Sequence, residues 1–316
     1  MPSTITSQSK STKQPNTEST PNEITQYYYP DPVSQQVIQQ WLFMDLLPWQ
    51  QPTWQYLTTH LHALPHAMLF AGNAGTGKRA FVYRFVAWAL CGNQRDNAQG
   101  VTTACGQCQS CQWLIANTHP DLYQIPTPTV ARDASPKPQA NNALVAQAPT
   151  HQSGYSIKID EIRELQPFVT QSSGGLRIVV IHQADAMTLA ASNALLKTLE
   201  EPAENVLMLL ISDSPSQLLP TIRSRLQSFS VSHVTPDQSM QAMQQLLPNT
   251  DTATLQQVSE LSGYAPFLAL QMLNSEWYQH RQTWINSFQA VRSGQRTPVQ
   301  ASNYWQKTLT LTDFLY

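Results

Sequence analysis

Three glycines and a lysine in the segment MLFAGNAGTGKRA form the pattern of a phosphate-binding loop. In such a loop, backbone N–H groups and the start of the following helix bind phosphate oxygens, and the lysine reaches the outer phosphates. A glycine-rich turn without a ligand is the alternative, but an apolar strand before the loop and a helical pattern after it favour an inherited nucleotide site. The predicted nucleotide-binding residues, functional or vestigial, are Gly72, Asn73, Gly75, Thr76, Gly77 and Lys78.

The groups that would bind Mg²⁺ beside this loop are missing. A working loop carries Ser or Thr after the lysine, and a carboxylate ends a second apolar strand. Here Arg79 follows the lysine, and His182 and Gln183 follow the strand RIVVI. Arginine offers only donors, and neither replacement is an anionic oxygen ligand. Asp185 lies two residues further on and should sit off the strand end. We therefore predict a degenerate Mg²⁺ site without meaningful ATPase activity, and these residues leave open whether ATP or ADP still binds.

All four cysteines of the chain lie close together, as Cys91, Cys105, Cys108 and Cys111. In a reducing compartment such clustering favours a metal site over disulfides. Four thiolates suit a tetrahedral, structural Zn²⁺ site that would staple a small module. An iron–sulfur cluster is the alternative, but the further Cys-Pro of ferredoxin runs is absent. His119 competes with Cys91 as the fourth ligand.

An alternation of predicted strands and helices must position these residues. Apolar runs at 66–70, 177–181 and 206–212 predict buried strands, and residues at helical spacing follow them. Continuous apolar strands separated by helices predict a parallel sheet that is covered on both faces. The helix in EIRELQPFVTQ is expected to be interrupted or kinked at Pro167. From about Val234 onward only helices are predicted.

The composition allows two or three domains but no strongly charged surface. The chain has 316 residues and a formal net charge of -2, so no global basic field indicates nucleic-acid binding. The longest apolar runs fall short of the roughly 18 to 20 residues that span a bilayer, and the N-terminus lacks the apolar stretch of a signal peptide. We therefore expect a cytoplasmic protein without a membrane partner. Polar, proline-rich composition predicts a disordered tail over residues 1–29 and a flexible insertion over about 126–154.

Several segments of the chain together match one known family. They are LPHAMLFAGNAGTGKRA, the Cys-x2-Cys-x2-Cys module with THPDLY, KIDEIREL, RIVVIHQADAMTLAASNALLKTLEEPAEN and LLPTIRSRLQ. In these segments the chain resembles the delta-prime subunits of the bacterial DNA polymerase III clamp loader. The match runs from about Pro48 to about Leu273, apart from the insertion, and NALLKTLEEP is its most specific part.

This resemblance implies an α/β protein of the AAA+ class, whose P-loop domain has a parallel sheet. The nucleotide-binding-like domain would cover 30–233, with a zinc module over about 91–119 inserted after the first helix. A small helical lid would follow over 234–274. Residues 275–316 would begin an all-α collar domain, which we expect to be truncated because this region is shorter than the family's collar.

The resemblance also gives a role to one arginine. The segment TIRSR matches the family's Ser-Arg-Cys motif, with Ser224 and Arg225 in place and Leu226 replacing the cysteine. In the family this arginine projects into the ATP site of a neighbouring subunit, where it would act as an arginine finger on the γ-phosphate. Arg223 is a second candidate, and a merely solvated arginine is the alternative. The lid stretch ELSGYAPFLALQML contains no arginine, a third missing catalytic part.

The function implied is that of a non-catalytic clamp-loader subunit. It would work with the ATPase gamma/tau subunits and the delta subunit to load the sliding clamp onto primed DNA, within the DNA-directed DNA polymerase (nucleotidyltransferase) holoenzyme. A catalytically active ATPase of the gamma/tau type is the alternative, and it would need Asp185 or another group to hold Mg²⁺. A DNA-binding protein built on the zinc module is a third possibility, against which the low charge counts.

Overall fold

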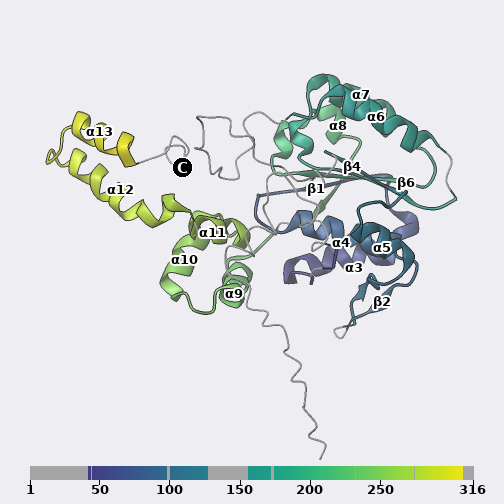
Figure 1. Cartoon of the computed structure of the whole chain (residues 1–316), viewed down its shortest axis with the longest axis horizontal. Helices are drawn as coiled ribbons and strands as arrows, with labels where there is room; N and C mark the ends of the chain where they lie inside the picture. The colour runs from purple at the N-terminus through teal and green to yellow at the C-terminus, as the bar shows by residue number, and fades with distance from the viewer. Residues whose placement is uncertain are drawn as a thin grey trace, which may run out of the picture.

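The structure, a computed structural model, contains an α/β domain followed by a series of helices (Figure 1). It describes residues 42–43, 45–97, 100–126, 156–171, 174–231, 233–273 and 275–308. The tail predicted over residues 1–29 lies outside these ranges. The predicted insertion also lies outside them after its first residue, Pro126.

Five parallel strands form the central sheet of the molecule. Their order is β4 (Leu122–Ile125), β5 (Arg177–Ile181), β6 (Val206–Ser212), β1 (Ala67–Ala71) and β7 (Gln227–Ser230). In their register Ala71 pairs with Ser212 and Ile181 pairs with Leu210, so β1, β5 and β6 end at the same edge. The predicted α/β class with a parallel sheet is confirmed.

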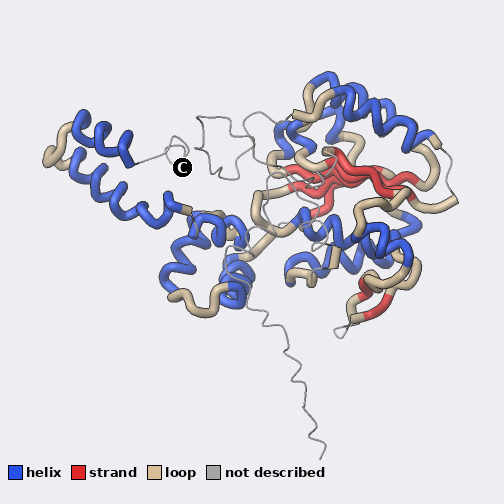
Figure 2. The backbone as a smooth tube through the Cα atoms, in the orientation of Figure 1, coloured by secondary structure: helices blue, strands red, loops and turns tan. Residues whose placement is uncertain are grey.

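Helices cover both faces of this sheet (Figures 1 and 2). Successive side chains of a strand point to opposite faces, so Leu69 and Val179 lie in one hydrophobic cluster while Phe70 and Val180 lie in the other. The first cluster is covered by α6 (Ile159–Thr170), α7 (Leu189–Glu200) and α8 (Pro220–Arg223). The second is covered by α3 (Gln51–Thr59), α4 (Lys78–Leu90) and α5 (Gln109–Ile115).

Short elements connect these layers. The 3-10 turns are η1 (Pro48–Gln50), η2 (Leu61–Ala63), η3 (Ala184–Ala186) and η4 (Pro215–Gln217). A small antiparallel ribbon of β2 (Arg95–Asp96) and β3 (Thr102–Thr103) precedes α5. Together with α5, this ribbon forms the excursion that carries the cysteines.

Helix α6 continues through Pro167, so the helix is not interrupted at this residue as one of the two predicted outcomes had it, and the other outcome, a kink, stays a prediction. Proline cannot donate a hydrogen bond to the carbonyl four residues earlier, that of Arg163. Both residues are exposed, so water can bond to that carbonyl instead. The opposite face of α6 buries Ile162, Leu165 and Val169, and this burial keeps the helix in place.

Three helices follow the sheet and pack against it: α9 (Pro236–Leu246), α10 (Thr252–Leu261) and α11 (Pro266–Leu273). The Thr235 hydroxyl and the Asp251 carboxylate cap α9 and α10 at their first turns. Met243 and Phe267 of this three-helix group belong to the same cluster as Phe70 of the sheet. The group and the sheet therefore share one core.

A helix pair, α12 (Glu276–Arg292) and α13 (Pro298–Thr308), extends from the three-helix group away from the sheet (Figure 1). The N-cap of α12 is Ser275, whose hydroxyl accepts a hydrogen bond from the Tyr278 N–H. Within the described ranges, no helix combines the length and the apolar character that crossing a membrane requires.

Candidate nucleotide loop, cysteine site and arginine

The glycine loop joins β1 to α4 at the edge where β1, β5 and β6 end. Gly75 and Gly77 have φ angles of 75° and 83°, a left-handed conformation that favours glycine. Gly77 caps α4, whose first residue is Lys78. The parallel register therefore brings the loop next to the residues that follow β5 and β6.

The ammonium group of Lys78 is held by its own chain. Lys78 is 2% exposed, and its Nζ donates to the carbonyl oxygens of Gly72 and Asn73, each at 2.9 Å. Its third partner is the carboxylate of Asp213, the residue after β6. An ammonium has three N–H donors, so all of them are engaged. Burial lowers the pKa of Lys78, and Asp213 works against that shift.

Arg79 lies beside the same carboxylate. Its Nη2 is 3.5 Å from Asp213 Oδ2, and the arginine is buried. One carboxylate thus stands between two buried cations, and Arg79 occupies the sequence position at which a working loop carries the Mg²⁺-binding hydroxyl. This arrangement reduces the positive charge that the loop would otherwise present to a phosphate.

The turn η1 fixes the outer side of the loop. Trp49 Nε1 donates to the Thr76 carbonyl oxygen and Gln50 Nε2 donates to the Gly77 carbonyl oxygen, both at 3.1 Å. Within the loop, the Thr76 hydroxyl donates to the Asn73 carbonyl oxygen at 3.0 Å. Two buried side chains from outside the motif therefore hold its backbone.

Helix α11 closes over the loop from another direction. The Phe267 N–H donates to the Gly75 carbonyl oxygen at 3.1 Å. A Cβ atom on Gly75 would lie 2.5 Å from the backbone nitrogen of Leu268. Gly75 is therefore needed for two reasons, its positive φ and the close approach of α11.

His182 takes part in a buried network at the end of β5. Its ring stacks on that of Tyr83, with centroids 5.2 Å apart and planes at 15°. The Tyr83 hydroxyl donates to Gln124 Oε1, so the network assigns the proton to His182 Nε2, which donates to the Tyr83 oxygen at 2.5 Å. Burial, with a contribution from Arg79, lowers the pKa of His182 to about 3. The imidazole is therefore neutral at pH 7.

The other two residues after β5 lie in or beside η3. Gln183 has a φ of 47° and forms the N-cap of this turn. Asp185 lies inside the turn, and its charge opposes the lowering of the Lys78 pKa that burial causes. The end of β5 therefore presents a neutral imidazole where a working site would present a carboxylate.

The four cysteine sulfurs come together between α4 and α5. All four Sγ atoms lie within 4.8 Å of one another. Three of the six Sγ–Sγ distances are 3.7 Å between Cys91 and Cys111, 3.8 Å between Cys91 and Cys108, and 3.9 Å between Cys105 and Cys111. A tetrahedral ion with Zn–S bonds of about 2.3 Å would place its sulfurs about 3.8 Å apart. The cluster thus has the dimensions of a site for one ion bound by four thiolates.

His119, the alternative fourth ligand, bonds elsewhere. Its Nδ1 accepts a hydrogen bond from the Asp121 N–H at 3.1 Å, so Nε2 carries the proton and donates to Ser110 Oγ at 2.8 Å. The Ser110 hydroxyl in turn donates to the Leu90 carbonyl oxygen. This chain ties the end of α4 to α5, and it leaves Cys91 as the fourth member of the cluster.

Arg225 lies on the surface after α8. Its Nη2 donates to Glu200 Oε1 at 2.6 Å, and its Nη1 donates to the Thr221 carbonyl oxygen at 2.9 Å and to Ser224 Oγ at 3.4 Å. The Arg225 side chain is 36% exposed. Arg223, the second candidate, is the last residue of α8 and is also exposed.

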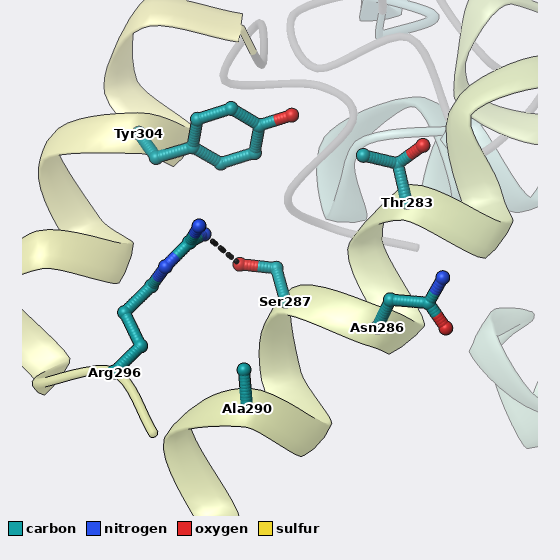
Figure 3. Close-up of a pocket in the computed structure, with 6 residues that line it drawn as sticks. All are labelled: Thr283, Asn286, Ser287, Ala290, Arg296 and Tyr304. Carbon is teal, nitrogen blue, oxygen red and sulfur yellow. Dashed lines mark hydrogen bonds between the residues drawn. The ribbon is translucent and has the colours of Figure 1, made fainter. Parts of the chain in front are cut away.

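A pocket of about 240 Å³ lies between α12 and α13 (Figure 3). Arg296 Nη1 and Trp305 Nε1 both donate to Ser287 Oγ at 3.2 Å, and the Arg296 guanidinium lies 5.4 Å from the Tyr304 ring centroid. The polar groups of this pocket bond to one another, and these bonds hold α12 and α13 together. The lining residues are Thr283, Asn286, Ser287, Ala290, Arg296 and Tyr304.

Sequence reasoning missed four residues of these sites: Trp49, Gln50, Asp213 and Glu200. A signal existed for Asp213, because it follows a predicted strand and parallel strands end at one edge of a sheet. Glu200 lies in the NALLKTLEEP segment, but nothing in the pattern pairs it with Arg225. The bonds of Trp49 and Gln50 to loop carbonyls depend on a tertiary contact that no local pattern encodes.

Comparison with known proteins places the chain in one family. The family model described as "DNA polymerase III, delta subunit" matches residues 49–235. DNA polymerase III subunit delta' of Pseudomonas aeruginosa is 38% identical over 228 residues, which are 71% of this chain and 60% of that protein. The subunit delta' of Escherichia coli is 27% identical over 240 residues, which are 75% of this chain and 63% of that protein.

The matches cover only part of each relative's length. The chain spans about three-fifths of the length of these two curated relatives. Among solved structures, a DNA polymerase III gamma subunit-related protein of Thermotoga maritima matches 73% of this chain and 76% of its own length. Its sequence identity to this chain is 16%, and the TM-score is 0.33. The family model and the identity to delta' relatives are sufficient: the chain belongs to the delta' subunit family of DNA polymerase III.

Proposed function

We propose that this chain is a non-catalytic AAA+ subunit of the DNA polymerase III clamp loader. It would pack beside ATPase subunits of the gamma/tau type and the delta subunit, and help to load the sliding clamp onto primed DNA during replication. Its contacts with clamp and DNA would be made through the complex. The chain would be located in the cytoplasm. It would be a component of the DNA-directed DNA polymerase holoenzyme.

The observation that supports a non-catalytic role is the compensated charge in the phosphate loop. Lys78 donates to two loop carbonyls and pairs with Asp213, and Arg79 shares that carboxylate. A triphosphate would have to displace Asp213, an anion that is already in place. The neutral His182 at the end of β5 supplies no charge to hold Mg²⁺. ATP or ADP is therefore at most a passive ligand in this proposal.

Arg225 would act in the ATP site of a neighbouring subunit. A guanidinium that is 36% exposed, just after a short, packed helix, can reach a partner, whereas buried Arg79 cannot. In a neighbouring site it would stabilise the charge that develops on the γ-phosphate. The loss of catalytic groups in this chain's own loop agrees with a role for the chain in another subunit's reaction.

The cysteine cluster would hold a structural Zn²⁺ ion. Its four sulfurs are separated as a tetrahedral site requires, and Cys91 and Cys111 are buried. A Cys₄ set leaves no open position for a substrate or water. Its contribution would be to stabilise the excursion over about 91–119.

The domain organisation proposed from the resemblance fits these roles. The AAA+ domain would cover 30–233 and the lid would be the three-helix group within 234–274. The helix pair within 275–316 would begin the collar through which clamp-loader subunits associate. Such an arrangement would place Arg225 on the AAA+ domain, facing the next subunit.

The proposal is tested by ATP turnover of the chain alone and of a complex assembled with gamma/tau and delta subunits, sliding clamp and primed DNA. We expect no turnover by the chain alone. In the complex, Arg225→Ala should lower the DNA-stimulated rate by at least about tenfold, because an arginine finger stabilises the transition state. Arg223→Ala is the matched control and should leave the rate near that of the unaltered complex.

Two results would contradict the proposal. An unchanged rate with Arg225→Ala would remove the arginine-finger assignment. Turnover by the purified chain that disappears with Lys78→Ala would instead establish the alternative, an active ATPase of the gamma/tau type.

A further inference from the structure

The ion pair between Arg225 and Glu200 links two elements that are fixed relative to each other. Glu200 is the last residue of α7, and Arg225 follows the end of α8. The two helices pack together through Leu195, Leu199 and Ile222, all buried in one cluster. The positions of both side chains are therefore set by packed backbone and do not depend on a mobile loop.

Glu200 is in an electrostatically unfavourable place for a carboxylate. The C-terminal end of a helix carries partial negative charge, so an anion there needs a cation nearby. Arg225 supplies that cation through the 2.6 Å bond from Nη2 to Glu200 Oε1. The same guanidinium bonds the Thr221 carbonyl oxygen near the end of α8, so it compensates two helix ends at once.

Arg225 has more hydrogen-bond donors than its contacts within the described residues use. A guanidinium has five N–H donors, and three are engaged by Glu200, Thr221 and Ser224. The other two donors make no hydrogen bond to any residue in the part of the chain that the structure describes. Two donors are sufficient for a two-bond contact with phosphate oxygens. Arg225 can therefore contact a phosphate without leaving Glu200.

The ion pair between Arg225 and Glu200 is better suited to positioning the arginine side chain than to stabilising the fold. The side chains of Arg225 and Glu200 are 36% and 50% exposed, and water and salt screen the attraction within exposed pairs of this kind. Such a pair adds little to the stability of a domain. It does restrict the rotamers of a long side chain, and a restricted arginine loses less entropy when it meets its target.

We propose that Glu200 is a positioning residue for Arg225, holding its guanidinium toward the phosphates of a nucleoside triphosphate bound by the neighbouring subunit. This inference rests on the proposed role of Arg225. Glu200 itself does not touch the nucleotide and acts only through the arginine. Its hydrogen bond is the essential part, so an uncharged acceptor of the same shape should replace it.

The test measures DNA-stimulated ATP turnover in the assembled complex as a function of ATP concentration. Glu200→Ala should lower kcat about two- to fivefold, the equivalent of up to about 1 kcal/mol, and leave KM unchanged. Glu200→Gln keeps an acceptor oxygen and should restore most of the rate. Glu201→Ala, an equal charge change one residue further on, is the matched control and should have no effect.

The double variant Glu200→Ala/Arg225→Ala separates positioning from a general structural effect. If Glu200 acts only through Arg225, the double variant has the rate of Arg225→Ala alone. A rate lower than that, or an unchanged rate with Glu200→Ala while Arg225→Ala is impaired, overturns the positioning role and leaves the arginine finger intact. An unchanged rate with Arg225→Ala overturns both.

Discussion

At the scale of single residues, the main feature of the phosphate loop is the compensation of its positive charge by a carboxylate of the same chain. The loop keeps its glycines and Lys78, which the sequence pattern identifies directly. Asp213 then neutralises the lysine, and Arg79 lies at the same carboxylate. In the proposed non-catalytic role, loss of function would not require loss of the lysine, because an anion supplied by the chain would compensate its charge.

His182 provides a prediction at this scale, based on its pKa. The folded protein holds the pKa of His182 at about 3, while in the unfolded chain this pKa has its ordinary value of 6.5, so the unfolded state binds more protons between these values. Stability is therefore complete above about pH 6.5 and decreases as the pH falls toward 3, by up to about 1.4 kcal/mol per pH unit for one proton.

The measurement compares urea unfolding of the wild type and His182→Gln from about pH 7 to about pH 5. Glutamine has no proton to bind in this range and can still bond to the Tyr83 hydroxyl. The wild type should lose stability more steeply than the variant on acidification. Parallel pH profiles would show that His182 is not buried in its neutral form.

At the scale of elements, the excursion formed by β2, β3 and α5 has too small a hydrophobic core to be stabilised by packing alone. The ribbon of β2 and β3 has two residues in each strand, and α5 has seven. Only a few of its side chains, such as Cys111 and Leu114, are fully buried. Small modules of this size are commonly stabilised by a metal or by disulfides.

We therefore predict that the purified chain contains zinc and that Cys111→Ser loses it. The free energy of unfolding should fall by at least about 2 kcal/mol, since a tightly bound ion stabilises the folded state by mass action. Metal quantification and urea unfolding are the measurements, and a chelator should reproduce the effect in the wild type. His119→Gln is the control and should retain zinc, because His119 bonds to Ser110. Equal zinc content in wild type and Cys111→Ser would contradict the site.

The contact between α11 and the glycine loop gives the second prediction at this scale. An alanine Cβ at Gly75 would meet the Leu268 backbone at 2.5 Å, so α11 would have to move. Gly263→Ala is the matched control: its φ is also positive, at 62°, but no described atom lies within 4 Å of the added carbon. We expect about 1 to 2 kcal/mol of destabilisation from the backbone conformation in both variants, and about 1 to 3 kcal/mol more for Gly75→Ala.

Urea unfolding measures both variants, and hydrogen exchange of the α11 amides locates the effect. Faster exchange in α11 of Gly75→Ala alone would show that the loop holds this helix. Equal destabilisation by the two substitutions would mean that α11 moves aside at no cost, which would contradict the contact.

At the scale of the whole molecule, the sequence was sufficient where a segment is continuously apolar or regularly periodic. The strands β1, β5 and β6 match the predicted apolar runs closely, and after Val234 the described residues form helices and no strand, as predicted. The strands β4 and β7 were not predicted, for different physical reasons. β4 buries a polar residue, Gln124, that bonds to Tyr83, and β7 is a short edge strand with mostly exposed side chains. Neither has the apolar pattern of a central strand.

The residues of the candidate sites also divide into those that the sequence pattern identified and those that it did not. The glycine loop and the four cysteines were found by their spacing, because that spacing is itself the chemical requirement. Asp213, Trp49 and Glu200 were not found, since each acts through a partner that is distant in sequence. A residue whose role depends only on tertiary contact leaves no periodic signal.

The core shared by the sheet and the three-helix group has a consequence for mechanics. Met243 and Phe267 pack in the same cluster as Phe70 of the sheet, and α11 also bonds to the glycine loop. Movement of these helices relative to the sheet would therefore expose apolar surface and break a backbone hydrogen bond together. The orientation of the three-helix group relative to the sheet is therefore coupled to the backbone conformation of the glycine loop.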